Sequence, residues 1–436
     1  MLKRISIAFF VFFLCISFLK ADTGSSKDTS GGFIVPFSLK SLTTALPDDI
    51  GKTHALYDSL EIFANQLGGR MNGTILIARH DTILLQKSYG YLELYKSYDG
   101  YGWLSEKELN YRRCMYANTL INNSLFELAS VSKQFTAAAI LKLCRDGKIS
   151  LTDSLHTFFP KIPYGEVTIR QLLNHTSGLP EYFNFDYKVY DTSTFVTNEQ
   201  LLRVLENSKP QRMFLSGQGY KYCNTNYALL AAIVAKVSGM PFEQYVRDNL
   251  WKPAGMKNTF FFTELVGLYP GYVQPECSIR KGQDYINVKP IEGITSRPLT
   301  RGHWRTGNLA LYDRLNGILG DKGVYTTAED LLRWVNVYYM EYQILPEEVI
   351  NEATNIQNKL PNGTYPKDLY GYGVHLEDSP DHGFLVYHGG LWNGYHNLWL
   401  YRPKDGLVII FLSNFYNSSH TGKSNEFLEM YDRQAR

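Results

Sequence analysis

The spacing of apolar residues predicts an α-helix near the start of the chain, followed by a β-hairpin. Between positions 55 and 67 apolar residues recur every three or four positions, which is typical of an amphipathic helix, and two glycines end the run. Segments 73–79 and 82–90 are rich in strand-forming residues and are separated by two polar positions. We therefore expect a helix that leads into two antiparallel strands.

The later parts of the chain predict helices in the middle and strands near the end. Helical patterns cover 126–143, 226–238, 242–250 and 425–434. Strand patterns separated by turn residues cover 371–377, 383–388, 395–402 and 406–413. This order predicts an α+β fold, in which an antiparallel sheet from the first and last thirds is flanked by helices and the middle third forms a helical subdomain.

The first residues have the layout of a secretory signal peptide. Lys3 and Arg4 precede an apolar run over 5–19, and Ala21 supplies a small residue for cleavage. The run is shorter than the roughly 20 residues that a bilayer-spanning helix needs. We therefore expect export to the periplasm or the medium, with a membrane tether only where the segment stays uncleaved.

These patterns suggest how the chain is divided. Residues 1–21 are expected to be the signal peptide and 22–52 a linker rich in small and polar residues. Residues 53–436 are expected to form a single domain. Within it, 53–160 and 306–436 would contain the sheet, and 161–305 would be the helical region.

Composition narrows the classes of function. The chain has 436 residues, of which 44% are hydrophobic and 20% are charged, as in an ordinary globular protein. A net charge of +2 gives no reason to expect a nucleic-acid partner. The sequence has no C-x-x-C or H-E-x-x-H motif, so neither a metal nor a cofactor is expected. The cysteines after the signal segment permit disulfides, although their spacing is unlike a disulfide scaffold; they are Cys114, Cys144, Cys223 and Cys277.

An S-x-x-K motif within 126–143 is the first candidate for chemistry. Ser130 and Lys133 are three positions apart, so on a helix their side chains lie on the same side. A serine hydroxyl needs a neighbouring base to become a nucleophile, and an amine in a partly dry pocket loses its proton more readily. On its own the motif is also explained by a helix-capping serine followed by a surface lysine.

Two further polar clusters come later. Tyr222-Cys223-Asn224 precedes the helical pattern at 226–238, and a phenol near a lysine ammonium is expected to have a lowered pKa. Alone, this cluster also reads as a turn tyrosine with a helix-capping asparagine.

The third cluster is His388-Gly389-Gly390, at the end of an expected strand. Its glycines would let the backbone come close to a ligand, and the backbone amide of Leu391 could pair with that of Ser130 to hold an oxyanion. A turn histidine before a glycine corner would look the same.

Taken together and in this order, the three clusters resemble the serine β-lactamase and penicillin-binding-protein family. The branch is the one that contains class C β-lactamases, D,D-carboxypeptidases, D-aminopeptidases and related esterases. Framework segments of that branch also match at 175–180, 224–227, 320–327 and 370–373. The resemblance covers about residues 56–415.

The resemblance implies a serine hydrolase that cleaves an amide, peptide or ester through an acyl-enzyme. Ser130 would be the nucleophile, Lys133 and Tyr222 would share the acid–base work, and Asn224 would position the substrate. The backbone amides of Ser130 and Leu391 would form the oxyanion hole.

It also implies that His388, Gly389 and Gly390 bind the substrate. His388 stands where class C β-lactamases carry the lysine of K-T-G, which puts efficient β-lactam hydrolysis in doubt. As a cation, this histidine could meet a substrate carboxylate. Leu391 and Trp392 would make the rim of the pocket apolar.

Two alternatives remain beside the hydrolase. The first is a catalytically silent protein on the same fold that binds penicillin or cell-wall fragments. The second is a Ser-His-Asp hydrolase that uses His175 with Asp321 or Asp330, although no G-x-S-x-G elbow accompanies these residues.

Overall fold

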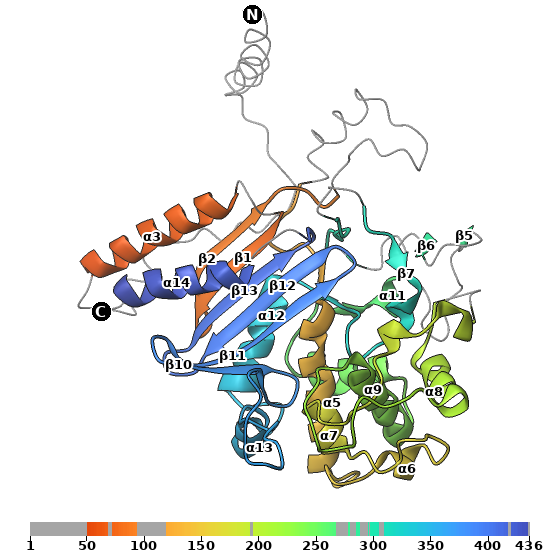
Figure 1. Cartoon of the computed structure of the whole chain (residues 1–436). Helices are drawn as coiled ribbons and strands as arrows, with labels where there is room; N and C mark the ends of the chain where they lie inside the picture. Colours follow the sequence, from red (N-terminus) through yellow and green to blue (C-terminus); the bar gives the residue numbers. More distant parts are fainter. Residues whose placement is uncertain are drawn as a thin grey trace, which may run out of the picture. The chain divides into compact units, whose positions relative to one another are not determined.

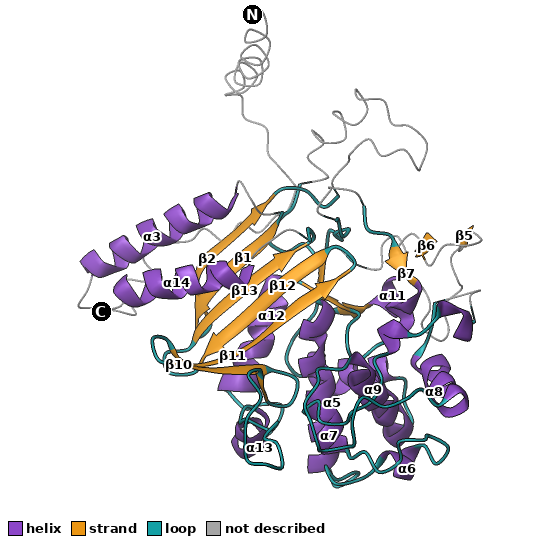
Figure 2. Ribbon diagram, in the orientation of Figure 1, coloured by secondary structure: helices purple, strands orange, loops and turns teal. Residues whose placement is uncertain are grey.

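A seven-stranded antiparallel sheet is the central element of the unit Lys52–Arg436 (Figures 1 and 2). Its strand order is β2-β1-β13-β12-β11-β10-β9. The strands are β1 (Gly73–Arg79), β2 (Thr82–Tyr89), β9 (Leu369–Tyr370), β10 (His375–Ser379), β11 (Gly383–Trp392), β12 (Tyr395–Arg402) and β13 (Leu407–Ser413). Strands from the two ends of the domain thus share one sheet, and the expected α+β fold is confirmed.

The structure is a computed structural model. It describes residues 50–68, 72–93, 119–191, 195–266, 278–279, 285–287, 295, 297–304, 309–416 and 420–434. The expected signal peptide, all but the end of the linker, Cys114 and Cys277 lie outside these residues. No helix in the described part of the chain is long and apolar enough to span a bilayer.

Helices cover both faces of the sheet, which explains why its central strands are apolar throughout. Every residue of β13 is buried, and so is β1 up to its last residue. In Figure 1, α3 (Ile50–Gly68) and α14 (His420–Gln434) cross one face together, and α12 (Ala328–Val335) lies behind the sheet against β1 and β13.

The remaining helices gather beside one end of the sheet (Figure 2). They are α5 (Lys133–Arg145), α6 (Leu155–Phe158), α7 (Ile169–Leu173), α8 (Asn198–Ser208), α9 (Asn224–Ser238), α10 (Phe242–Val246), α11 (Phe262–Leu265) and α13 (Glu347–Ala353). Short single turns lie between them, of which η2 (Ala129–Ser132) and η3 (Tyr182–Asn184) matter for the site. The buried faces of α5 and α9 pack on each other, which fixes the positions of their first residues.

Two small sheets complete the described strands. β3 (Phe126–Glu127) and β4 (Phe260–Phe261) both pair with β8 (Val324–Thr326). The other sheet is β5 (Ser278–Ile279), β6 (Tyr285–Asn287) and β7 (Tyr312–Asp313). Pairing of β3 with β8 brings the chain just before Ser130 next to the chain just after residue 322.

The expected strand at 371–377 is wrong in its first half. A chain reversal separates β9 from β10 there, so that Tyr370 pairs with His375. Gly373 has φ +80°, and a Cβ on Gly371 would lie 2.2 Å from the carbonyl oxygen of Ala353. These two glycines make the reversal because any larger side chain would be strained or would clash.

Strand β11 is longer than the expected 383–388. It continues to Trp392 and turns into β12 through Asn393-Gly394, which have φ of +43° and +83°. An Asn-Gly pair with two positive φ angles is the favoured two-residue hairpin turn, so the sequence did carry this signal.

Candidate active site

The segment that carries Ser130 changes direction sharply just before it. Strand β3 ends at Glu127, and Ala129 has φ +50°, a left-handed conformation that costs a non-glycine residue about 1–2 kcal/mol. Ser130 then lies in the turn η2, and α5 begins at Lys133. The serine is therefore placed by a strained corner between a strand and a helix, a kind of strain that clusters at active sites.

Lys133 is completely buried, and three acceptors surround its amine. The Nζ atom donates to Ser130 Oγ at 3.1 Å, to Asn224 Oδ1 at 2.8 Å and to the carbonyl oxygen of Asp321 at 2.9 Å. Burial lowers its pKa to about 8, although the charge of Asp321 opposes the shift. At neutral pH the neutral fraction is therefore far larger than that of an exposed lysine, which suits a base that acts on Ser130.

Tyr222 lies beside this pair, but its pKa changes in the direction opposite to the expected one. Its ring centroid is 4.9 Å from Lys133 Nζ. Burial of the phenol raises its pKa well above 10 and outweighs the lowering by the Ser130 hydroxyl. The phenol is therefore neutral at physiological pH, a proton carrier rather than a phenolate base.

Asn224 is held by a carboxylate that sequence reasoning missed. Glu181 Oε2 accepts from the Asn224 backbone amide at 2.7 Å and from its Nδ2 at 3.0 Å. Because Nδ2 donates to Glu181, the Asn224 carbonyl oxygen faces Lys133. Glu181 directly follows the framework segment 175–180, which was the available signal.

A second buried lysine, Lys322, lines the pocket, and its amine makes two hydrogen bonds and an ion pair within the protein. It donates to Tyr182 Oη at 2.8 Å and to the carbonyl oxygen of Ile318 at 2.9 Å, and it lies 3.6 Å from Asp321 Oδ1. Burial lowers its pKa, although Asp321 counteracts the effect. The positive charge of Lys322 is therefore balanced by Asp321 inside the protein.

His388 is neutral and not a cation that waits for a carboxylate, which corrects the expectation from sequence. Its Nδ1 donates to the carbonyl oxygen of Gly389 at 2.6 Å, and its Nε2 accepts from Tyr370 Oη at 3.1 Å. Burial lowers its pKa well below 6.5, and neighbouring His375 and Lys133 add to the shift. Both ring nitrogens are already occupied.

The end of β11 faces the Ser130 turn. A Cβ on Gly390 would lie 2.1 Å from the carbonyl oxygen of Leu128, so only glycine permits this approach. Because Trp392 and Tyr395 flank the two-residue turn, they form a hydrogen-bonded pair, and Leu391 and His396 form the next, non-hydrogen-bonded pair. The Leu391 amide thus points away from β12, toward the free edge of β11.

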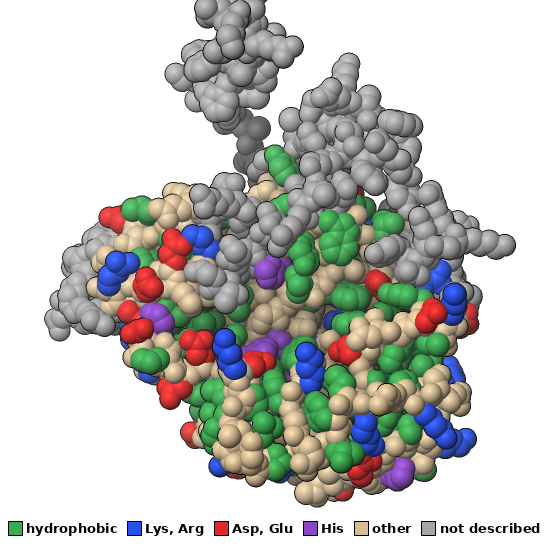
Figure 3. Space-filling model, viewed as in Figure 1, with side chains coloured by type: hydrophobic (Ala, Val, Ile, Leu, Met, Phe, Trp, Pro, Cys, Tyr) green, Lys and Arg blue, Asp and Glu red, His purple; other side chains and the backbone are tan. Residues whose placement is uncertain are grey.

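A pocket of about 380 Å³ joins these groups. It is lined by Ala129, Ser130, Phe183, Tyr222, Asn224, Asp321, Lys322, Asp368, His375, His388, Gly389, Gly390, Leu391, Trp392 and His396. Figure 3 shows histidine side chains at a hollow in the middle of the face of the molecule that it draws. The sequence motifs supplied Ser130, Tyr222, Asn224 and the β11 residues, whereas Phe183, Lys322, Asp368, His375 and His396 were not foreseen as site residues.

One wall of the pocket is apolar. The rings of Phe183 and Trp392 stack with centroids 5.0 Å apart and planes 13° apart, and Leu391 is 49% exposed next to them. Lys322 Nζ lies 5.2 Å from the Trp392 ring. The wall offers an apolar substrate group a flat surface to pack on.

The described residues form no Ser-His-Asp triad at His175. Its Nδ1 accepts from the backbone amide of Cys223 at 3.2 Å. The Asp321 carboxylate accepts from Tyr182, and Asp330 accepts from the Asn258 amide at 2.6 Å. His175 is thus a structural histidine beneath the pocket.

Cys223 and Cys144 are both free thiols. Cys223 is fully buried, and burial raises its pKa to about 12. Since the thiolate is the reactive form, this thiol is inert.

Comparison with known proteins identifies the family. A family model described as Beta-lactamase matches residues 73–430. Penicillin-binding protein 4* of Bacillus subtilis (strain 168) is 32% identical over 351 residues, which are 79% of this chain and 68% of that protein. A putative D-alanyl-D-alanine carboxypeptidase of Salmonella typhimurium is 26% identical over 314 residues, 66% of either chain. The chain thus spans about two thirds of the length of these relatives.

Solved structures share the fold. The octameric penicillin-binding protein homologue from Pyrococcus abyssi aligns over 88% of this chain and 76% of its own, with a TM-score of 0.62 and 23% identity. The D-amino acid amidase from Ochrobactrum anthropi SV3 aligns over 85% of this chain and 96% of its own, with a TM-score of 0.61 and 19% identity. With the family model matched over most of its length, the chain belongs to the Beta-lactamase family.

Proposed function

We propose that this protein is an exported serine hydrolase that cleaves an amide, peptide or ester through an acyl-enzyme on Ser130. The observation that carries the proposal is the hydrogen bond of 3.1 Å from a buried lysine of lowered pKa to the Ser130 hydroxyl. The three donated bonds are those of the ammonium form; once Lys133 has lost a proton, its lone pair faces Ser130 across the same contact and takes the serine proton as the oxygen attacks the carbonyl carbon. The amides of Ser130 and Leu391 hold the oxyanion.

The leaving group needs a proton, and Tyr222 is suited to deliver it. Its phenol is neutral and interacts with the Ser130 hydroxyl, and its ring lies 4.9 Å from Lys133 Nζ, so we assign it the relay of the proton from lysine to the departing nitrogen or oxygen. Asn224, held by Glu181, positions the substrate and keeps one hydrogen bond on Lys133.

The charges around the pocket support a substrate without a carboxylate next to the scissile bond. Lys322 is committed to protein acceptors, His388 is neutral, and Asp368 adds a negative charge to the lining. A carboxylate would be desolvated here without a partner, which is costly. An amide or ester with an apolar side chain against Phe183 and Trp392 fits better.

Intact-mass spectrometry with a p-nitrophenyl ester and with a penicillin tests the proposal. An adduct should form on the wild type and on Ser132→Ala, a matched serine in the same motif, and should be lost in Ser130→Ala. No adduct on the wild type with either reagent would contradict the acyl-enzyme. A permanent adduct that no substrate ever replaces would instead assign the silent binding protein.

A pair of substrates tests the preference. A peptide amide should be cleaved with kcat/KM at least about tenfold above that of the same peptide with a free terminal carboxylate, since one unpaired charge costs more than 1.4 kcal/mol. The reverse order would contradict the assignment of the pocket charges.

A further inference from the structure

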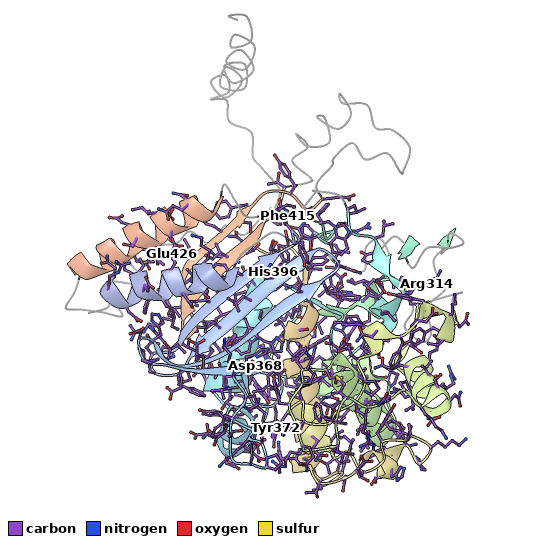
Figure 4. All side chains as sticks on the ribbon, viewed as in Figure 1. Arg314, Asp368, Tyr372, His396, Phe415 and Glu426 are labelled. Carbon is purple, nitrogen blue, oxygen red and sulfur yellow. The ribbon has the colours of Figure 1, made fainter. Side chains whose placement is uncertain are left out.

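A histidine and a carboxylate that the acylation step does not use lie on the polar side of the pocket. His375 Nδ1 and Asp368 Oδ1 are 2.7 Å apart, and Tyr220 Oη donates to Asp368 Oδ2 at 2.5 Å. Both Asp368 and His375 line the same pocket as Ser130. Figure 4 labels Asp368 on this face, near the lower ends of β10 and β11.

The pairing fixes which nitrogen of His375 carries a proton. Ionised Asp368 only accepts, so Nδ1 donates to it, and in the neutral ring the lone pair is on Nε2. Within the described residues Nε2 has no hydrogen-bond partner, whereas both nitrogens of neighbouring His388 are engaged. His375 is therefore a histidine with a carboxylate behind it and a free acceptor, the arrangement of a general base.

The surrounding rings hold His375 against the catalytic groups. It stacks on Tyr222 at 6.0 Å with planes 11° apart and contacts the His388 ring at 4.6 Å. The chain reversal at Gly371 and Gly373 brings His375 next to these rings, because the reversal lets Tyr370 of β9 pair with His375 of β10.

We propose that the Asp368–His375 pair is the general base for the water that hydrolyses the acyl-enzyme, a role that rests on the function proposed above. Lys133 and Tyr222 are less suited to this second step. The lysine amine is fully buried with three protein acceptors around it, and the phenol has a strongly raised pKa. His375 instead lines the pocket onto which Ser130 opens.

A water O–H proton passes to His375 Nε2 while the water oxygen forms a bond to the acyl carbon, and the carbonyl electron pair moves onto the oxyanion. On collapse the bond from carbon to Ser130 Oγ breaks, and the serine oxygen takes a proton from the Lys133 and Tyr222 pair. The product leaves as a carboxylic acid, and the proton on His375 returns to that pair through solvent.

Burst kinetics with a p-nitrophenyl ester separate the two steps, because acylation releases nitrophenol and deacylation sets the steady rate. In His375→Gln the steady rate should fall about 10²–10⁴-fold, the usual contribution of a general base, while the burst rate changes less than about threefold. The acyl-enzyme should accumulate on Ser130 by intact mass, and hydroxylamine should restore turnover. Asp368→Asn should slow the same step to a smaller extent.

His382→Gln is the matched control. His382 also pairs with an aspartate, Asp432, at 2.9 Å, but it is not among the residues that line the pocket. Both rates should equal those of the wild type.

Three results would overturn the role of the pair. Deacylation of His375→Gln within threefold of the wild type would remove it while leaving the acyl-enzyme intact. An equal fall in both rates, in His375→Gln and in Asp368→Asn, would make the pair structural. Absence of burst and adduct in the wild type would reject the acyl-enzyme itself, and the deacylating base with it.

Discussion

Glu181 influences the candidate base without touching it. Its carboxylate fixes the orientation of Asn224 through two hydrogen bonds, and its negative charge raises the pKa of Lys133 against the larger lowering effect of burial. Glu181 thus contributes both to the orientation of Asn224 and to the pKa of Lys133.

We expect Glu181→Gln to shift the pH profile of acylation to lower pH. Neutral Lys133 is the working form, so kcat/KM rises as pH increases through its pKa of about 8. Removal of the Glu181 charge lowers that pKa further, and the acidic limb moves in the same direction. The burst rate, measured between pH 5 and 9, gives the position of this limb. Glu199→Gln, which removes an exposed charge, is the control and should leave the limb in place. A limb that stays in place or moves to higher pH would contradict the coupling.

For single residues, the sequence predicted which side chains line the site better than it predicted their protonation states. Ser130 and Lys133 follow from a three-residue spacing, and the structure brings Tyr222, Asn224 and the β11 residues to the same pocket. The neutral state of His388 depends on Tyr370 and on burial, neither of which the motif contains.

At the scale of elements, the contact between β11 and the turn η2 (Ala129–Ser132) positions the two amides that we propose as the oxyanion hole. Gly390 lies against the backbone of Leu128, whereas a Cβ on neighbouring Gly389 would have as its nearest neighbour the Asn397 oxygen at 3.8 Å. The two glycines therefore differ in what an added methyl group would displace.

We expect Gly390→Ala to lower kcat/KM by more than about 100-fold, because the added Cβ must push β11 away from Ser130 and removes one oxyanion donor. The overpacking should also cost about 1–3 kcal/mol of unfolding free energy. Gly389→Ala should stay within about threefold in activity. Equal effects of the two changes, by ester hydrolysis and urea unfolding, would argue against the close contact.

Elements with a strong period were predictable, and those made by tertiary contact were not. The hairpin at 73–90 and the helix α9 follow their patterns. The reversal at Gly371 and Gly373 was read as a strand, because its aromatic residues suit a strand equally well. That misreading hid the Asp368–His375 pair, whose members lie on either side of the turn.

For the whole molecule, one buried arginine connects the last helix to the sheet. Arg402 of β12 is 1% exposed, and its guanidinium donates to both oxygens of Asp432 on α14, at 2.8 and 3.0 Å. It also donates to Asp405 at 2.7 and 3.0 Å. The guanidinium of Arg402 thus binds two carboxylates, one on each side.

We expect Arg402→Met to destabilise the fold by about 3–5 kcal/mol, since it leaves two partly buried carboxylates without their partner. Lys423→Met breaks an exposed pair with Glu426 on the same helix and should cost less than about 1 kcal/mol. Urea unfolding measures both. Similar midpoints for the two variants would show that the arginine does not hold α14 to the sheet.

The pairing of β1 with β13 has a consequence for how the chain gains activity. Ser130 is synthesised well before β11, the strand that faces it, and β11 belongs to a sheet whose strands come from both sides of the helical region. Such long-range pairing is slow compared with local helix formation. A partly folded chain would therefore carry the proposed nucleophile without the proposed oxyanion amide of Leu391, so we expect any activity to appear only after β11 to β13 have joined the sheet.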